Sequence, residues 1–336
     1  MRRDCGRYEG AAMRILLSIL LILLFVPDWS GEARLPLLPR DATVQATPML
    51  LEPGNPERTQ LGGLTFLGGV ALQGDGAAFG GFSAMAVDGD RFTLLSDGGN
   101  IVSFTMDADW TPRAVRFAEL PAGPGKGWRK QDRDSESLTT DPATGRIWVG
   151  FERANAIWRY DRGFARAQAH STPPALANWS SNGGAEAMVR LRDGRFIMLA
   201  EDRKGDAAGT VRGVLFSGDP VVAPRRGFTF SYRPPRGFKP TDMAELPDGR
   251  IAILNRRFAL PLSFTATLTV VPRKAIRRRA IVTGREIARF EGSVLHDNFE
   301  ALAAVREGRD TILWIASDDN QLFLQRSLLL KFRLDR

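Results

Sequence analysis

Five segments of the chain each begin with a polar residue that stands two positions before an apolar one. The polar residues are Ser83, Glu136, Glu186, Thr241 and Glu300, and the apolar ones are Met85, Leu138, Met188, Met243 and Leu302. Carboxylates and hydroxyls are hard oxygen ligands of the kind that calcium prefers, with water completing about six to eight coordination positions. If the five polar side chains converge, they predict one calcium ion on a common axis. The competing interpretation is an ordinary polar lining of solvated strand ends.

The spacing of these segments is typical of a β-propeller. Their starts are separated by 53, 50, 55 and 59 residues, and each holds a strand, a tight turn such as Asp248-Gly249, and a strongly apolar strand. Glycine supplies the positive φ that hairpin turns require, and about four strands per repeat of this length are typical of propeller blades. We therefore expect an all-β single propeller with five blades, or six if a degenerate blade precedes Gly80. The C-terminal repeat offers only one more strand, Ser327–Leu334, so an N-terminal strand over residues 61–72 would complete the last blade.

A second set of polar residues follows the apolar strand of each repeat. Hairpin geometry places this set at the same mouth of the channel as the first, and its members are Asp97, Glu152, Glu201, Asp202, Asn255, Arg256, Asp318 and Asp319. Mixed carboxylates and cations suit a phosphoester, because cations bind the oxyanions while a carboxylate orients or deprotonates water. We expect Asp97 or Asp202 to act as the base and Arg256 to contact phosphate.

Basic residues of neighbouring loops would bind the substrate: Lys126, Arg133, Arg203 and Lys239, with Arg129 and Lys130 in the same loops. The competing interpretation is that each of these is a solvated loop charge.

Other sites and partners are disfavoured. The sequence has no Gly-x-Ser-x-Gly motif and no glycine-rich phosphate-binding loop. The only histidines, His170 and His296, lack the spacing of zinc ligands, although His296 beside Asp297 is an alternative acid–base pair. The net charge of +8 favours an anionic partner, but scattered arginines without a nucleic-acid motif argue against nucleic acid. We expect a small anionic, phosphorylated substrate, and we interpret the run Lys274–Arg279 as a solvated outer edge that would meet an anionic surface.

The N-terminus has the pattern of a signal peptide. An apolar run extends from Ile15 to Val26, interrupted only by Ser18 and preceded by Arg14, and it is shorter than the roughly 20 residues that span a bilayer. We expect residues 1–33 to be a signal peptide, with Met13 as an alternative start, residues 34–60 an extended linker, and residues 61–336 the propeller. The protein would then be periplasmic or secreted, with no membrane span after cleavage; an uncleaved anchor is the alternative. The only cysteine, Cys5, would be removed, leaving no thiolate for a disulfide or a nucleophile.

The repeats resemble those of a known family. The motifs Gly80-Gly-Phe-Ser83-Ala-Met, Asp134-Ser-Glu136-Ser-Leu, Gly183-Gly-Ala-Glu186-Ala-Met and Asn298-Phe-Glu300-Ala-Leu are similar to those of bacterial phytase-like proteins described as having esterase-like activity. The axial order Ser, Glu, Glu, Thr, Glu is also similar to that of calcium-activated nucleotidases, five-bladed propellers with a central calcium. The first resemblance implies hydrolysis of phosphate or other esters.

Two classes of function follow from these observations. The first is an exported, calcium-dependent hydrolase of phosphoesters or related esters, with a lactonase-type metal hydrolase as a variant that would use the same site. The second is a non-catalytic propeller that binds a ligand or a protein at its mouth and keeps a structural metal.

Overall fold

The computed structural model describes Met13 and residues 16–18, 38–39, 42–127, 129–260, 263–322 and 325–335. The chain divides into two units, Met1–Arg34 and Leu35–Arg336. In the first unit, Met13 and residues 16–18 are helical. The expected signal peptide, Cys5 and the cleavage site lie otherwise outside the described residues. Among the residues that are described, no helix is long and apolar enough to cross a membrane.

The strands from Val44 onward form five sheets, in which every pairing but one is antiparallel. These sheets are the five blades expected from the repeats. Blade 1 comprises β4 (Phe82–Asp88), β5 (Arg91–Ser96), β6 (Asn100–Met106) and β7 (Pro112–Glu119). Blade 2 comprises β8 (Ser135–Thr140), β9 (Ile147–Phe151), β10 (Ala156–Tyr160) and β11 (Ala167–Ser171). Blade 3 comprises β12 (Ala187–Arg190), β13 (Phe196–Lys204), β14 (Val211–Phe216), β15 (Gly227–Arg233) and β19 (Ile281–Thr283). Blade 4 comprises β16 (Lys239–Glu245), β17 (Ile251–Ala259), β18 (Ser263–Val271) and β20 (Arg285–Phe290).

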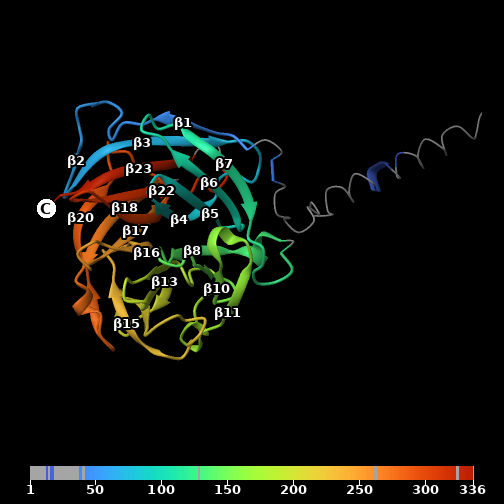
Figure 1. Cartoon of the computed structure of the whole chain (residues 1–336), viewed down its shortest axis with the longest axis vertical. Coiled ribbons are helices and arrows are strands. Elements are labelled where there is room, and N and C mark those ends of the chain that lie inside the picture. The colour runs from blue at the N-terminus through green and yellow to red at the C-terminus, as the bar shows by residue number, and fades with distance from the viewer. Residues whose placement is uncertain are drawn as a thin grey trace, which may run out of the picture. The chain divides into compact units, whose positions relative to one another are not determined.

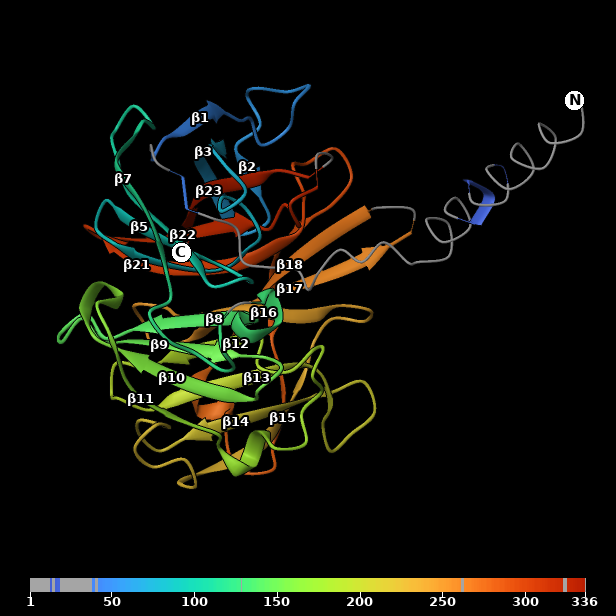
Figure 2. The same ribbon diagram turned by 90° about the vertical axis from the view of Figure 1, so that its right-hand side faces the viewer.

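Blade 5 joins the two ends of the propeller sequence. It comprises β21 (Phe299–Glu307), β22 (Asp310–Ser317), β23 (Ser327–Leu334), β3 (Leu64–Gly74), β1 (Val44–Pro48) and β2 (Gln60–Leu61). The N-terminal β3 pairs with the C-terminal β23 from Ser327↔Leu72 to Leu334↔Leu64, and Figure 2 shows these strands together. The expected closure by an N-terminal strand is confirmed, and β1, within the expected linker, adds a further strand to the same sheet.

Among the described residues, four short 3₁₀ helices lie between strands: η1 (Lys130–Arg133), η2 (Arg162–Phe164), η3 (Pro174–Leu176) and η4 (Arg273–Ala275). In Figure 1 the inner strands β4, β8 and β16 lie near the middle of the fold, whereas β1, β11 and β15 lie at its periphery.

The ring closes with five blades and leaves no place for a sixth. Five hydrophobic clusters fill the spaces between neighbouring blades, in the order 1–2, 2–3, 3–4, 4–5 and 5–1. The inner strands contact one another in the same cyclic order: β4 with β8, β8 with β12, β12 with β16, β16 with β21, and β21 with β4. Because apolar burial is the main favourable term in folding, these interfaces account for closure. The alternative of a degenerate sixth blade before Gly80 is wrong, since the strands there belong to blade 5.

The five apolar residues that define the repeat plug the channel. Met85, Leu138, Met188, Met243 and Leu302 are each at most 5% exposed. Each comes from the inner strand of a different blade. All five line a cavity of about 210 Å³ and none lines the larger polar cavity described below, so this plug separates the two cavities.

Candidate functional site

A polar cavity of about 460 Å³ lies at the mouth where the inner strands begin. All five blades contribute to its lining, which consists of Ser83, Asp97, Glu136, Glu152, Asn182, Gly183, Glu186, Glu201, Asp202, Lys239, Arg256, Glu300, Asp318 and Asn320. The lining holds eight carboxylates against two cations. An excess of buried carboxylates is costly unless they are paired or bound to a metal, so the cavity is suited to a cation.

β-Bulges hold four of the five axial residues, which are Ser83, Glu136, Glu186, Thr241 and Glu300. In blades 1, 2, 4 and 5 the pairing of the inner strand with its neighbour skips one residue. The skipped residues are, in that order, Ser83, Glu136, Thr241 and Glu300. A bulge inserts an unpaired residue and re-aims its side chain. In blade 3, Glu186 instead directly precedes the first paired residue, Ala187.

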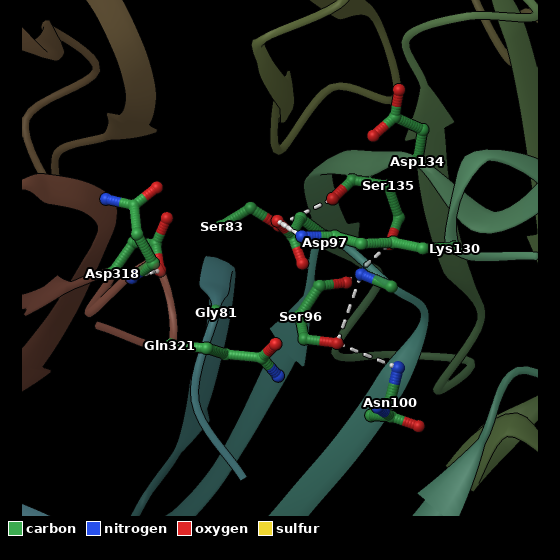
Figure 3. Close-up of polar contacts among 12 residues, drawn as sticks. Gly81, Ser83, Ser96, Asp97, Asn100, Lys130, Asp134, Ser135, Asp318 and Gln321 are labelled. Atoms are coloured by element: carbon green, nitrogen blue, oxygen red, sulfur yellow. Dashed lines mark hydrogen bonds and ion pairs between the residues drawn. The ribbon is translucent and has the colours of Figure 1, made fainter. Parts of the chain in front are cut away.

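The two axial hydroxyls bridge neighbouring blades. The Ser83 hydroxyl donates to the Ser135 carbonyl at 2.5 Å, as Figure 3 shows, and the Thr241 hydroxyl donates to the Phe299 carbonyl at 3.2 Å. Ser83 lines the cavity, but Thr241 is 1% exposed and lies outside the lining. Of the five residues predicted to surround one ion, four are therefore brought to the cavity.

Carboxylates crowd together on the side of blades 2 and 3. Oxygen atoms of Asp134, Glu136 and Glu152 lie within 4.8 Å of one another, and Glu186 hydrogen-bonds Glu152. Burial, followed by the charges of neighbouring carboxylates, raises the pKa of Glu136 and of Glu186 well above the ordinary value. The same two causes raise the pKa of Asp134 to about 6. A hard divalent cation would relieve this repulsion, and the oxygen donors fit one.

Glycine allows the acidic cluster to assemble. One Glu152 oxygen accepts hydrogen bonds from the amides of Gly183 and Gly184. Gly183 has φ +103°, and a Cβ built there would lie 2.7 Å from the Asp202 carboxylate. Only glycine tolerates both the backbone conformation and this close approach.

Arg256 neutralises the opposite side of the cavity. Its guanidinium donates to Glu300, to Glu201 at 3.0 Å and to the Asn298 side-chain oxygen at 2.6 Å. Burial raises the pKa of Glu300 to about 7, against the opposing charge of Arg256. The predicted phosphate contact is thus held by two carboxylates in the structure.

Each predicted base is paired with a lysine. The Lys130 Nζ atom lies 2.5 Å from Asp97 Oδ2 (Figure 3), and the Lys239 Nζ atom lies 2.6 Å from Asp202 Oδ1. Burial raises the pKa of Asp97, while the Lys130 charge opposes the shift. The Asp202 side chain is 44% exposed against 20% for Asp97, so Asp97 is the better enclosed of the two.

Of the four residues predicted to bind the substrate, one lines the cavity and three do not. Lys239 lines the cavity. Lys126 and Arg203 are exposed and do not line it. Arg133 is buried, and its guanidinium donates to the Pro124 carbonyl at 2.5 Å, supporting the loop that precedes η1.

A family comparison identifies the fold that carries this site. The profile described as "Phytase-like: Esterase-like activity of phytase" matches residues 77–321. This chain belongs to the phytase-like family. The match spans all of blades 1 to 4 and part of blade 5, and it includes every residue that lines the cavity. No curated protein matches this phytase-like propeller.

Solved structures that resemble the phytase-like propeller do so at low identity. An α-L-arabinofuranosidase from Podospora anserina is 13% identical, with TM-score 0.49 and coverage of 88% of this chain and 98% of that one. The aldose sugar dehydrogenase of Streptomyces coelicolor is 13% identical, with TM-score 0.42 and coverage of 88% and 99%. Hydrazine synthase of Kuenenia stuttgartiensis is 14% identical, with TM-score 0.40, and this chain spans 66% of its length.

Sequence reasoning assigned no role to Asp134, Asn298, Asn182 or Asn320. Asp134 and Asn298 each stand two positions before an axial glutamate, where Lys239 stands before Thr241. Alignment of the repeats therefore indicated that these two residues occupy equivalent positions next to the axial residues. Asn182 and Asn320 lie in loops outside that register, and only the folded structure brings them to the cavity.

The buried carboxyls predict that the metal-free phytase-like propeller loses stability as pH rises. The folded-state pKa is about 8 for Asp318 and about 7 for Glu300, chiefly because of burial, against ordinary values of 3.8 and 4.5. The folded state thus binds these protons more tightly than the unfolded chain. Their stabilising contribution is complete below pH ~4 and is lost as pH rises through about 7 to 8.

We expect a melting temperature several degrees lower at pH 9 than at pH 5 in the presence of chelator. Asp318→Asn should flatten this dependence, because each pKa unit corresponds to about 1.4 kcal/mol. Asp90→Asn, in an exposed hairpin turn, should leave it unchanged. Stability that rises between pH 5 and pH 9 would contradict the prediction.

Proposed function

We propose that this phytase-like propeller is an exported, calcium-dependent hydrolase of phosphoesters or related esters. The observation that carries the proposal is the polar cavity, in which carboxylates from blades 1, 2, 3 and 5 face Lys239 and Arg256 of blade 4. Carboxylates alone would repel an anionic ester, so a cation and the lysines at the rim are needed to admit it.

Calcium would be held by Glu136 and Glu152, with Asp134, Glu186, Glu300 and the Ser83 hydroxyl as further oxygen donors nearby. A bound divalent ion supplies Lewis-acid polarisation of a phosphoryl or carbonyl oxygen. Support comes from the short separations within the Asp134, Glu136 and Glu152 cluster and from the raised pKa of Glu136.

Asp97 is the residue we assign as base. Its pKa is raised by burial, which brings a carboxylate closer to the pH at which a base works well. Asp97 takes a proton from water, the water oxygen bonds to phosphorus, and the bond from phosphorus to the ester oxygen breaks. The departing alcohol takes up a proton from solvent.

Two lysines would hold the anionic ester. Lys130 and Lys239 each have side chains that are more than 40% exposed and already pair with a carboxylate of the site. On binding, each would exchange part of that pairing for the oxyanion. Arg256 keeps Glu201 and Glu300 in place in this proposal.

The test is turnover of a panel containing p-nitrophenyl phosphate, bis(p-nitrophenyl) phosphate, p-nitrophenyl acetate and a simple lactone. We expect phosphoester turnover that chelator abolishes and calcium restores. Preferential turnover of the lactone would identify the lactonase variant. Turnover that is indifferent to chelator would contradict the role of the metal.

The second candidate is a binding propeller with a structural metal. It is favoured by the ion pairs that engage both predicted bases and by the commitment of Arg256 to two carboxylates. No turnover on any ester, combined with a large rise in melting temperature on adding calcium, would establish this candidate instead.

A further inference from the structure

Five exposed arginines form a patch on blade 3, away from the cavity. Arg225 and Arg226 belong to the loop between β14 and β15, and Arg277, Arg278 and Arg279 precede β19. We call these five residues the basic patch. No role in the proposed hydrolysis falls on any of them.

An excursion of the chain brings the two halves of the basic patch together. After β18 of blade 4 the chain crosses to blade 3, where β19 pairs in parallel with β15 before the chain returns to blade 4 as β20. The Arg279 amide donates to the Thr229 carbonyl at 2.9 Å. The Arg278 guanidinium lies 5.7 Å from the centre of the Phe228 ring, which follows Arg226 by two residues.

Carboxylates near the basic patch are engaged elsewhere. Asp219, in the same loop as Arg225, pairs with Arg159 at 2.5 Å. Asp193 pairs with Arg195 and with Arg273, which precedes Arg277 by four residues. Within the described ranges, none of the five guanidiniums of the basic patch lies within ion-pair distance of a carboxylate oxygen. Their positive charge is therefore uncompensated.

Two exposed aliphatic side chains accompany the arginines. Val222, in the Arg225 loop, is 70% exposed, and Ile281, two residues after Arg279, is 49% exposed. Cations interleaved with exposed aliphatic residues suit a lipid interface, where arginines meet headgroups and aliphatic groups enter the acyl boundary. Single-stranded nucleic acid instead requires exposed aromatic platforms, and Arg278 covers the Phe228 ring of the patch.

The basic patch lies at the end of the blade that is opposite to the cavity. In blade 3, Phe216 pairs with Phe196 at one end of β13, whereas Glu201 and Asp202 lie toward its other end. The Arg225 and Arg226 loop follows Phe216, at the end remote from the cavity. A surface bound by the basic patch would leave the cavity open.

From this arrangement we propose that the basic patch docks the propeller on an anionic phospholipid bilayer, with the cavity facing away from the lipid. Charge attraction supplies most of the affinity, so binding depends on anionic lipid and weakens with salt. Val222 and Ile281 add a smaller contribution that salt does not screen.

The experiment measures co-sedimentation of the mature protein, without the expected signal peptide of residues 1–33, with vesicles of phosphatidylcholine, with and without about 30% phosphatidylglycerol. Removing three charges by Arg225→Gln, Arg277→Gln and Arg279→Gln should weaken binding to the anionic vesicles about 100-fold, since each basic residue near the surface contributes about fivefold. Arg278 is retained because it packs on Phe228.

The matched control removes the same charge elsewhere. Arg91, Arg116 and Arg236 are exposed and lie outside both the basic patch and the cavity, so replacing all three by Gln should change binding less than threefold. Val222→Ser with Ile281→Ser should reduce the binding that persists at high salt. Unchanged melting temperatures establish that all variants fold.

Three results would overturn the proposal. One is equal loss of binding in the two arginine triples, which would indicate attraction by net charge alone. Another is equal binding to vesicles with and without phosphatidylglycerol. The third is tighter, patch-dependent binding to heparin or duplex DNA than to the vesicles, which would assign the patch to a soluble polyanion. None of these results bears on the hydrolysis proposed for the cavity.

Discussion

Glu136→Gln should weaken the binding of calcium to the propeller while making the metal-free protein more stable. Burial and the charges of Glu186 and other carboxylates raise the pKa of Glu136 well above the ordinary value, so its ionisation at neutral pH is costly. Glutamine keeps the shape without the charge and removes that cost. It also removes a charged oxygen donor from the cluster with Asp134 and Glu152.

The measurement is the melting temperature at pH 8 with chelator and with a series of calcium concentrations. The variant should melt at a higher temperature than the wild type in chelator, and its calcium affinity should fall by on the order of 100-fold, since even outer-shell changes cost about 10- to 100-fold. Glu119→Gln removes an exposed carboxylate on β7 and serves as the control. A wild-type calcium response in Glu136→Gln would show that the ion binds elsewhere.

Asp97→Asn should lower kcat for the phosphoester by about 10²- to 10⁴-fold with little change in calcium affinity, because general-base catalysis contributes about that much. The amide cannot accept a proton, yet it fills the same space beside Lys130, which lies 2.5 Å from Asp97. Asp202→Asn, in the more exposed pair with Lys239, should lower kcat less than tenfold and raise KM instead.

Single-turnover and steady-state kinetics at saturating calcium distinguish these outcomes. The pH dependence adds a second readout, since loss of a base should remove the acidic limb of the rate profile. If Asp97→Asn keeps its wild-type kcat and Asp202→Asn does not, the two roles are reversed. If neither variant changes kcat, no base comes from this pair and the assignment fails.

The sequence was sufficient to predict the architecture and the end of the channel at which the polar cavity lies. Its repeats have regular spacing and each hairpin carries its own turn residues, so blade number and strand order depend on local signals. The short C-terminal repeat and the strand before Gly80 likewise predicted that β3 would close blade 5. Aligning the repeats on Met85 and its equivalents also placed the axial glutamates at one mouth, because strand register relates each to the plug below it.

Only the tertiary structure decided how the charges are partnered. Arg256, predicted to contact phosphate, lies between Glu201 and Glu300, which come from blades 3 and 5. Arg133 supports a loop, since its guanidinium reaches the Pro124 carbonyl. The β19 excursion, which assembles the basic patch, joins two blades through a parallel pairing that no repeat signals. Such contacts depend on which blades adjoin and on the direction that each bulged or buried side chain takes. The periodicity of the sequence carries no information about blade adjacency or side-chain direction. These contacts therefore form only when the ring closes.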